Sequence, residues 1–347
     1  MHSALVLLIL VVIVALIFDY INGFHDTANS IATVVSTRVL RPTQAVMMAA
    51  ALNLFGAFLG VEVAKTIGKG MVAADSVTQL TVFSALIGAI IWNLITWYFG
   101  IPSSSSHALI GGLCGAASAF SGFNSIKIDG LVNKVFIPMI VSPVLGLVIG
   151  FIVMTALYWI LFRAKPGFVN RWFGKLQLAS AGLMALSHGS NDAQKTMGII
   201  TMALISYQAT VPGQLTLPEW VLPTASHDFH VPLWVVISCA AAMGAGTLAG
   251  GWRIIHTMGS KMIKLQPVHG FAAETSAAIM ILSASHMGMP VSTTHVISSS
   301  IMGVGASKRF SAVRWGVVGS ILWAWVLTFP MAFAFGAGTF YLMDIFF

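Results

Sequence analysis

Two short polar clusters with one shared pattern interrupt long apolar stretches of this chain. Residues 100–107 read Gly-Ile-Pro-Ser-Ser-Ser-Ser-His, and residues 288–295, 188 positions later, read Gly-Met-Pro-Val-Ser-Thr-Thr-His. Proline followed by Ser or Thr is typical of a helix start, where free backbone N–H groups and a partial positive charge favour an anion. The hydroxyls add further donors, so the paired clusters predict a site for an oxyanion. The alternative is that Ser and Thr only allow helices to pack closely in a membrane.

A second repeated pattern places an acidic residue within an apolar tract in each half of the chain. Residues 23–29 read Gly-Phe-His-Asp-Thr-Ala-Asn, and residues 189–195 read Gly-Ser-Asn-Asp-Ala-Gln-Lys. An ionisable side chain inside a membrane segment is costly and marks a functional site. Because Asp26 and Asp192 would repel an anion, we expect them to hold a proton or a cation that travels with it. Capping of a broken helix is the structural alternative for both residues.

Other polar side chains flank these two aspartates. Lys195 lies about one helical turn after Asp192, so it can pair with Asp192 or contact the anion instead. Histidine titrates near neutral pH, and His25, beside Asp26, is therefore a candidate proton relay. Three amides can supply neutral oxygens or N–H donors: Asn22, Asn29 and Asn191. Glu274 is a further acidic residue in an apolar tract, without an evident partner.

The composition is that of a multi-spanning helical membrane protein. Of 347 residues, 57% are hydrophobic and only 8% are charged, whereas soluble domains carry about 25% charged residues. Mean hydropathy is +0.90. The net charge of +7 comes from basic residues at the ends of apolar segments, as in cytoplasmic loops, and does not indicate nucleic-acid binding. The two cysteines have no metal-site or disulfide spacing.

Ten apolar tracts are candidates for membrane segments, since a helical span needs about 20 residues. They cover 3–37, 44–64, 79–99, 101–122, 135–162, 177–206, 231–251, 270–287, 289–305 and 312–346. The first and sixth are too long for one straight helix, and we expect their polar motifs to break them. The last contains Pro330 and forms either one helix or two.

The distribution of basic residues predicts the orientation of the chain. Arg163, Lys165, Arg171 and Lys175 crowd one short loop, which the positive-inside rule places in the cytoplasm. Threading ten crossings through the bilayer from this loop puts the N-terminus outside. The same threading makes the paired motifs run in opposite senses in the two halves.

These observations predict an all-α multi-pass membrane protein built as a five-plus-five inverted-topology repeat. Residues 1–162 form the first repeat, 163–176 form a basic cytoplasmic linker, and 177–347 form the second repeat. In such folds the substrate site lies near the membrane midplane, between the repeats, where broken or half helices meet. A transporter that works by alternating access is the function that fits this arrangement.

At these motifs the chain resembles the inorganic phosphate transporter (Pit) family, over nearly its whole length. The resemblance rests on residues 23–29, 102–107, 189–195 and 290–295. It implies an inverted repeat, extracellular termini, a phosphate site between half-helices, and a homodimer. The His-Asp-Thr-Ala-Asn and Asn-Asp-x-Gln-Lys forms are similar to those of bacterial low-affinity permeases of the cytoplasmic (inner) membrane. Those permeases are coupled to protons and take phosphate largely as a complex with a divalent metal.

The resemblance also implies roles for particular residues. Phosphate contacts are implied for Ser104, Ser105, Ser106, Ser292, Thr293 and Thr294. Cation or proton roles are implied for Asp26 and Asp192, with Asn29 and Asn191 as polar partners.

Proton coupling is expected because the chain departs from the sodium-coupled pattern at two positions. Sodium-coupled members have Ala-Asn-Asp-Val-Ala/Ser-Asn in both halves, whereas His25 and Lys195 stand here in place of two Asn residues. An imidazole or an amine is a poor sodium ligand. Sodium-coupled phosphate symport is kept as an alternative.

The sequence thus predicts a secondary transporter, not an enzyme, that imports inorganic phosphate with protons, with or without a divalent metal. The chain has no His-Glu-x-x-His or other close metal-ligand spacing that would support a hydrolase. A sulfate permease of the same family is one alternative, although phosphate can donate a proton to Asp26 or Asp192 at neutral pH and sulfate cannot. A passive anion channel is another, but it has less need of paired buried carboxylates.

Overall fold

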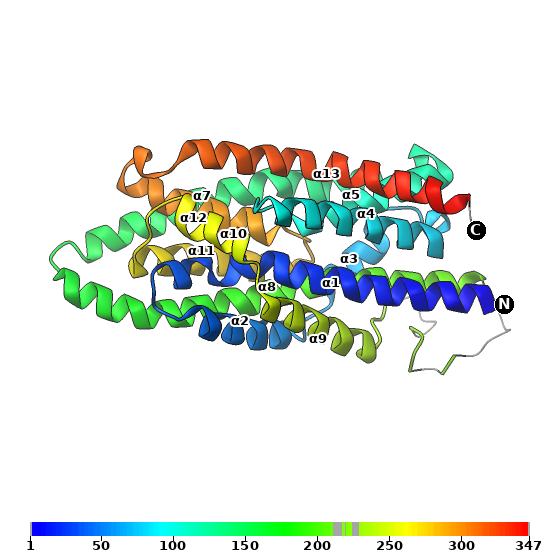
Figure 1. The fold of residues 1–347 in the computed structure, drawn as a ribbon, viewed down its shortest axis with the longest axis horizontal. Coiled ribbons are helices and arrows are strands. Elements are labelled where there is room, and N and C mark those ends of the chain that lie inside the picture. The colour runs from blue at the N-terminus through cyan, green and yellow to red at the C-terminus, as the bar shows by residue number, and fades with distance from the viewer. Residues whose placement is uncertain (1, 211–216, 219, 224–228, 346–347) are drawn as a thin grey trace.

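The computed structural model describes residues 2–345 except 211–216, 219 and 224–228, and this part of the chain is helical with no β-sheet (Figure 1). The helices of the first half are α1 (His2–Ser36), α2 (Pro42–Gly56), α3 (Glu62–Gly70), α4 (Gln79–Tyr98), α5 (Ser105–Ser121), α6 (Ile128–Leu131) and α7 (Ile137–Ile160). Those of the second half are α8 (Pro166–Thr210), α9 (Leu233–Ala249), α10 (Trp252–His256), α11 (Pro267–His286), α12 (Thr293–Lys308) and α13 (Trp315–Asp344). The start of α1 and the end of α13 lie at the same end of the elongated molecule (Figure 1).

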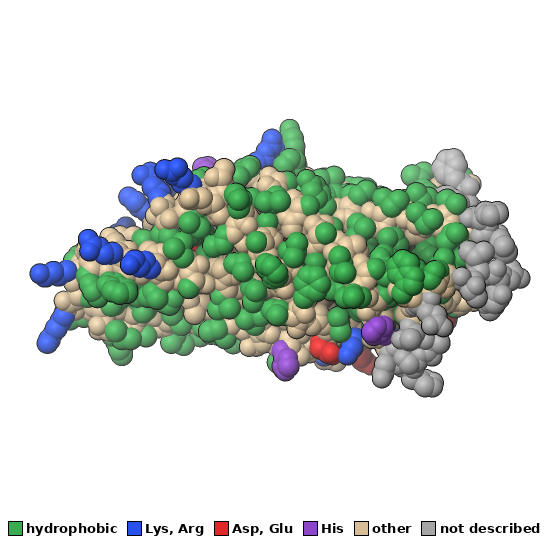
Figure 2. Space-filling model, turned by 90° about the horizontal axis from the view of Figure 1, so that it is seen from below, with side chains coloured by type: hydrophobic (Ala, Val, Ile, Leu, Met, Phe, Trp, Pro, Cys, Tyr) green, Lys and Arg blue, Asp and Glu red, His purple; other side chains and the backbone are tan. Residues whose placement is uncertain are grey.

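Several of these helices are long and apolar enough to cross a membrane. Among the described residues they are Ala4–Ser36, Gln79–Tyr98, Ile128–Ile160 and Trp315–Asp344. The helix pair α9 and α10 passes the same criterion as one span bent by 60°. Hydrophobic side chains cover much of the flank of the molecule, while Lys and Arg gather at one end (Figure 2). The prediction of an all-α multi-pass membrane protein is confirmed.

Two helical hairpins enter the molecule from opposite ends. The helix α4 runs inward from the end where α1 begins and α5 returns to that end, whereas α11 and α12 do the same from the other end (Figure 1). Residues 99–104 and 287–292 form the hairpin tips, near the middle of the molecule. Gly100 and Gly288 take matching left-handed conformations there, with φ of 65° and 66°, which favour glycine. The two segments with the shared pattern, 100–107 and 288–295, therefore lie where each hairpin turns, at the start of α5 and of α12.

The helices α1 and α8 are continuous through the motifs that the sequence predicts to break them. Their motif glycines serve close packing instead. A Cβ on Gly23 would lie 2.6 Å from the carbonyl oxygen of Met243 in α9, and one on Gly189 would lie 2.2 Å from that of Asn53 in α2. Small residues allow membrane helices to approach in this way. Asn and Gly are weak helix formers, which is why the sequence alone predicts a break, and packing overrides that preference.

The hairpins pack against the long helices in matching ways. The helix α5 lies along α13, and α12 lies along α7. At the closest approaches Gly115 of α5 faces the backbone of Phe333, and Gly303 of α12 faces the backbone of Leu147. The last apolar tract forms the single helix α13, although Pro330 lies inside it.

We expect Gly189→Ala to destabilise the protein by about 1–3 kcal/mol, because the added methyl group overlaps the backbone of Asn53. The matched control is Gly319→Ala in α13, since a Cβ at Gly319 meets no atom within 4 Å. The unfolding temperatures of both variants are measured in detergent. Equal unfolding temperatures for the two would contradict the packing role of Gly189.

Candidate functional site

Each hairpin tip presents the start of a helix to the middle of the molecule. The helix α5 begins one residue after Ser104, whose hydroxyl accepts the backbone N–H of His107 at 3.2 Å. The helix α12 begins one residue after Ser292, whose hydroxyl accepts the backbone N–H of His295 at 3.2 Å. Both serines are thus N-caps, which satisfy a backbone donor and fix the direction of the helix. Proline lies two residues before each cap, so it precedes the helix and does not start it.

The two tips touch each other. The imidazole rings of His107 and His295 lie edge to face, with centroids 4.9 Å apart. His295 also stacks on Trp325 of α13 at 3.9 Å, and the indole N–H of Trp325 donates to the carbonyl oxygen of Pro102 at 3.1 Å. The starts of α5 and α12, which are positive ends of helix dipoles, are therefore held close together.

On one side of the tips, Asp26 of α1 contacts the start of α12. Its Oδ1 lies 2.7 Å from Nδ1 of His25 and accepts the Thr294 hydroxyl at 3.3 Å. Asn29, one turn further along α1, donates its amide N–H to Thr293 at 3.2 Å and to Thr294 at 3.0 Å. These hydrogen bonds join the first half of the chain to the second.

On the other side, Asp192 of α8 makes similar contacts. Its Oδ1 lies 2.5 Å from Nζ of Lys195, and its Oδ2 accepts the Thr293 hydroxyl at 3.3 Å. Lys195 also donates to the Ser106 hydroxyl and, at 3.1 Å, to the carbonyl oxygen of Val291. One buried ammonium group therefore links α8 to the tips of both hairpins.

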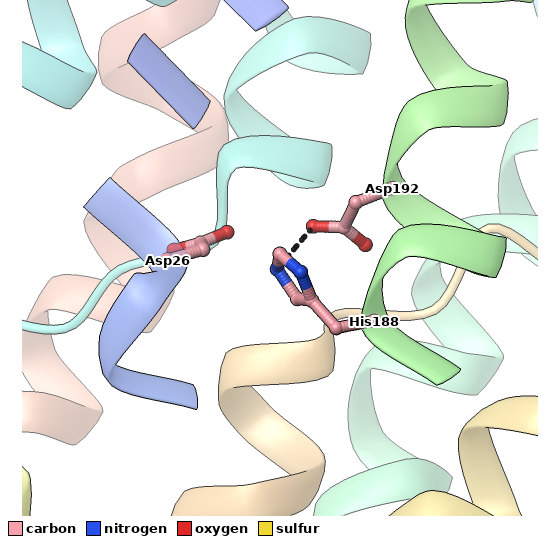
Figure 3. Close-up of side chains that lie close together, drawn as sticks. All are labelled: Asp26, His188 and Asp192. Atoms are coloured by element: carbon pink, nitrogen blue, oxygen red, sulfur yellow. Dashed lines mark ion pairs between the residues drawn. The ribbon is translucent and has the colours of Figure 1, made fainter. Parts of the chain in front are cut away.

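His188 lies between the two carboxylates (Figure 3). Its Nε2 is 3.3 Å from Asp192, and its Nδ1 is 3.1 Å from Oδ1 of Asn53. One ligand atom each from Asp26, His188 and Asp192 lies within 4.8 Å of the others, and all three side chains are buried. Imidazole and carboxylate groups are common ligands of divalent metals, so this triad can hold a divalent cation.

Several polar atoms of the predicted site residues have no hydrogen-bond partner within the described chain. They are the hydroxyl of Ser105 and the side-chain oxygens of Asn22, Asn29 and Asn191. The amide N–H of Asn191 donates to Ser285 at 2.8 Å and to the carbonyl oxygen of Met289 at 3.3 Å. A buried polar atom without a partner costs about 1–3 kcal/mol, so these atoms are ready to bind a ligand.

The structure brings most of the predicted residues to one place. A continuous series of contacts joins His25, Asp26, Asn29, Thr294, Thr293, Asp192, Lys195 and Ser106. Ser104 and Ser292 act as helix caps in this structure, and Asn22 contributes an unpaired oxygen nearby on α1. Asn53, which orients His188, is not among the residues predicted from the motifs. A lone amide in the apolar tract 44–64 is the signal that could have found it.

Glu274 of α11 has partners that the sequence does not reveal. Thr33 of α1 and Ser180 of α8 each donate a hydroxyl to its carboxylate, and Gln177 donates an amide N–H at 3.1 Å. Among the described residues no cation forms an ion pair with it. This network fastens the α11–α12 hairpin to α1 and α8 away from the tips.

Comparison with known protein families identifies the family of this chain. The sequence profile described as the phosphate transporter family matches it twice, over residues 22–169 and again over 164–336. The chain belongs to the phosphate transporter family. Phosphate is the substrate that this family transports, and the resemblance seen in the motifs is confirmed.

Relatives in the phosphate transporter family cover the whole chain. A Rhizobium meliloti protein described as a probable low-affinity inorganic phosphate transporter is 50% identical over 98% of this chain and 97% of its own. A Bacillus subtilis protein with the same description is 45% identical over 100% of both chains. The low-affinity inorganic phosphate transporter PitB of Escherichia coli is 30% identical over 97% of this chain and 96% of its own. All three are named as transporters and not as enzymes.

A solved structure shares the fold of this family member. It is described as the sodium-dependent phosphate transporter, and it matches with a TM-score of 0.85 over 99% of this chain and 100% of that chain. Sequence identity is 24%, so the likeness shows the fold.

We expect Lys195→Met to destabilise the protein by about 3–5 kcal/mol, since it leaves Asp192 as a buried charge without its cation. Adding Asp192→Asn to that variant should recover part of the loss, because both charges are then absent. Unfolding of the wild type, the two single variants and the double variant in detergent gives the coupling energy. Strictly additive losses would contradict a stabilising ion pair.

Proposed function

We propose that this protein imports inorganic phosphate with protons by alternating access, and that phosphate binds between the two hairpin tips. The observation that carries the proposal is the pair of hydroxyls at the start of α12. Thr294 donates to Asp26 of one half of the chain, and Thr293 donates to Asp192 of the other. An anion that accepts hydrogen bonds from both hydroxyls would leave both carboxylates free to bind a proton or a cation. Anion binding and cation or proton binding are thereby linked at one point.

The anion site would combine hydroxyls, helix starts and one ammonium group. Ser105 offers an unpaired hydroxyl, and Ser106 lies against Lys195. The backbone N–H groups at the starts of α5 and α12 add a partial positive charge, which suits a phosphate group. In this arrangement Ser104 and Ser292 hold the helix starts in place, while Thr293 and Thr294 donate to the anion.

The partners of the two aspartates support protons as the coupling ion and phosphate as the cargo. His25 lies 2.7 Å from Asp26, and Lys195 lies 2.5 Å from Asp192. These nitrogen groups stand where a sodium ion would need oxygen ligands. Phosphate keeps a proton at neutral pH that a carboxylate can accept, whereas sulfate does not.

We further propose that alternating access uses an inverted repeat of residues 1–162 and 177–347, joined by the linker 163–176. The family profile matches the chain once in each half, which supports a duplication. The hairpins enter from opposite ends, and α5 packs on α13 as α12 packs on α7 (Figure 1). Rocking of one repeat against the other would open the tips to one side at a time.

The protein would lie in the bacterial cytoplasmic membrane with its N-terminus outside. Lys and Arg gather at the end opposite to the start of α1 (Figure 2). Arg163 and Lys165, in the turn between α7 and α8, belong to that end. By the positive-inside rule this end faces the cytoplasm. The relatives described above are bacterial.

Radiolabelled phosphate uptake into proteoliposomes tests the transport proposal. We expect accumulation under an imposed proton gradient, no accumulation under an imposed sodium gradient, and no block by excess sulfate. Sodium-driven accumulation would overturn proton coupling. Equilibration without accumulation would instead indicate a channel, and a block by sulfate would indicate a sulfate permease.

Asp192→Asn should abolish proton-driven accumulation, because the carboxylate that accepts the Thr293 hydroxyl is lost. The variant should still fold, although the unpaired Lys195 destabilises it. Asp129→Asn is the matched control, since Asp129 is exposed in α6. Accumulation by Asp192→Asn at the level of this control would contradict the role of Asp192.

A divalent metal that travels with phosphate would bind to Asp26, His188 and Asp192. We expect EDTA to lower phosphate uptake by the wild type, and added magnesium or manganese to restore it. His188→Ala should weaken the response to added metal, because one of three ligands is gone. If EDTA leaves phosphate uptake by the wild type unchanged, the metal is not part of the cargo.

A further inference from the structure

Asp19 of α1 is a fully buried carboxylate that the transport site described above does not use. It lies seven residues before Asp26, which is roughly 10 Å along the helix, toward the end where α1 begins. Spacings of three and four residues place it on one face of α1 with a series of polar side chains, here called the α1 polar stripe. The stripe consists of Asp19, Asn22, Asp26, Asn29 and Thr33, all buried.

Few groups around Asp19 can stabilise a negative charge on its carboxylate. One oxygen accepts the Thr196 hydroxyl of α8 at 2.9 Å, and the other has no hydrogen-bond partner. The Cys239 thiol of α9 lies against the carboxyl group. The charged groups that face it are Lys195 and Asp192 of α8, and these two already pair with each other.

An ionised Asp19 would therefore be an unbalanced charge. Burying a carboxylate without a cation costs several kcal/mol even after relaxation, and one neutral hydroxyl offsets only part of that. Glu274 differs from Asp19, because its two oxygens together accept three hydrogen bonds, each from a neutral side chain. A proton on the unpaired oxygen of Asp19 removes the charge.

A metal ion fits this position less well than a proton. A hard cation such as sodium or magnesium prefers several oxygen ligands, and sulfur is a poor ligand for it. The described side chains against the Asp19 carboxyl group are one hydroxyl, from Thr196, and one thiol, from Cys239.

We propose that Asp19 is a proton-binding residue of the transport cycle, separate from Asp26 and Asp192. It takes up one proton on its unpaired oxygen when the site is open to the side where α1 begins, and it releases that proton after reorientation. The O–H bond forms and breaks at this oxygen, and no other bond changes. This inference rests on the proposed proton-coupled import, and it adds Asp19 as a further proton site beside the central aspartates.

The test compares Asp19→Asn with the wild type in proteoliposomes by two assays. One measures exchange of labelled for unlabelled phosphate without any gradient, and the other measures accumulation under a proton gradient. Because Asn resembles a protonated Asp, we expect exchange to persist and its dependence on pH to flatten. Accumulation should be lost, so that inside and outside concentrations become equal.

Two further variants keep the result interpretable. Asp19→Glu should restore accumulation, because it returns a titratable group, and the exposed-site control Asp129→Asn should behave as the wild type. If Asp19→Asn does not fold, Thr196→Val serves instead. It removes the hydroxyl donor and should shift the pH at which exchange is half-maximal, whereas a purely structural role would leave that pH unchanged.

Three outcomes would overturn the inference. They are accumulation by Asp19→Asn at the wild-type level, failure of Asp19→Glu to restore a lost accumulation, and an unchanged pH profile in Thr196→Val. Failure of the wild type itself to accumulate phosphate under a proton gradient would overturn the proposed function instead, so the two failures are distinguishable.

Discussion

The start of α12 is the point on which the rest of the site depends. The hydroxyls of Thr293 and Thr294 are the groups that bring Asp26 and Asp192 into one network, although these aspartates lie on helices from different halves of the chain. The hydroxyls can do so because Ser292 caps the helix and the tip is held against its counterpart through His295 and α13. The Ser292 cap and the ring contacts of His295 thus hold Thr293 and Thr294 where they link the two buried carboxylates. In a membrane, unpaired charges are costly.

Much of this arrangement follows from the sequence by elementary physical chemistry. The apolar tracts predict membrane helices, and the repeated Pro-x-Ser/Thr pattern predicts helix starts at membrane depth. Acidic residues within apolar tracts predict a functional site, and the structure brings Asp26 and Asp192 together with Lys195 and the hydroxyls of Thr293 and Thr294. The family assignment confirms what those motifs imply about the substrate.

Other features could not be predicted, because they depend on contacts between distant segments. Gly23 and Gly189 favour a helix break locally, yet neighbouring backbones at 2.6 and 2.2 Å from their would-be Cβ atoms require glycine in an unbroken helix. Hydropathy does not distinguish a hairpin that returns from two helices that cross, so the paths of α4, α5, α11 and α12 emerge only from the fold. Asp19 lies in the same apolar tract as Asp26, so its position is visible in the sequence, but its isolation is a property of its neighbours on α8 and α9.

The central claim is that phosphate binds where the two hairpin tips meet the aspartate network. The most direct measurement is phosphate binding to the purified protein by titration calorimetry, with the double variant Thr293→Val, Thr294→Val. The control is Ser298→Ala, because Ser298 is buried further along α12 and its hydroxyl has no partner within the described chain. We expect the double variant to lose phosphate binding while it unfolds at a temperature near that of the control, which still binds phosphate. Phosphate binding by the double variant at wild-type affinity would contradict the central claim.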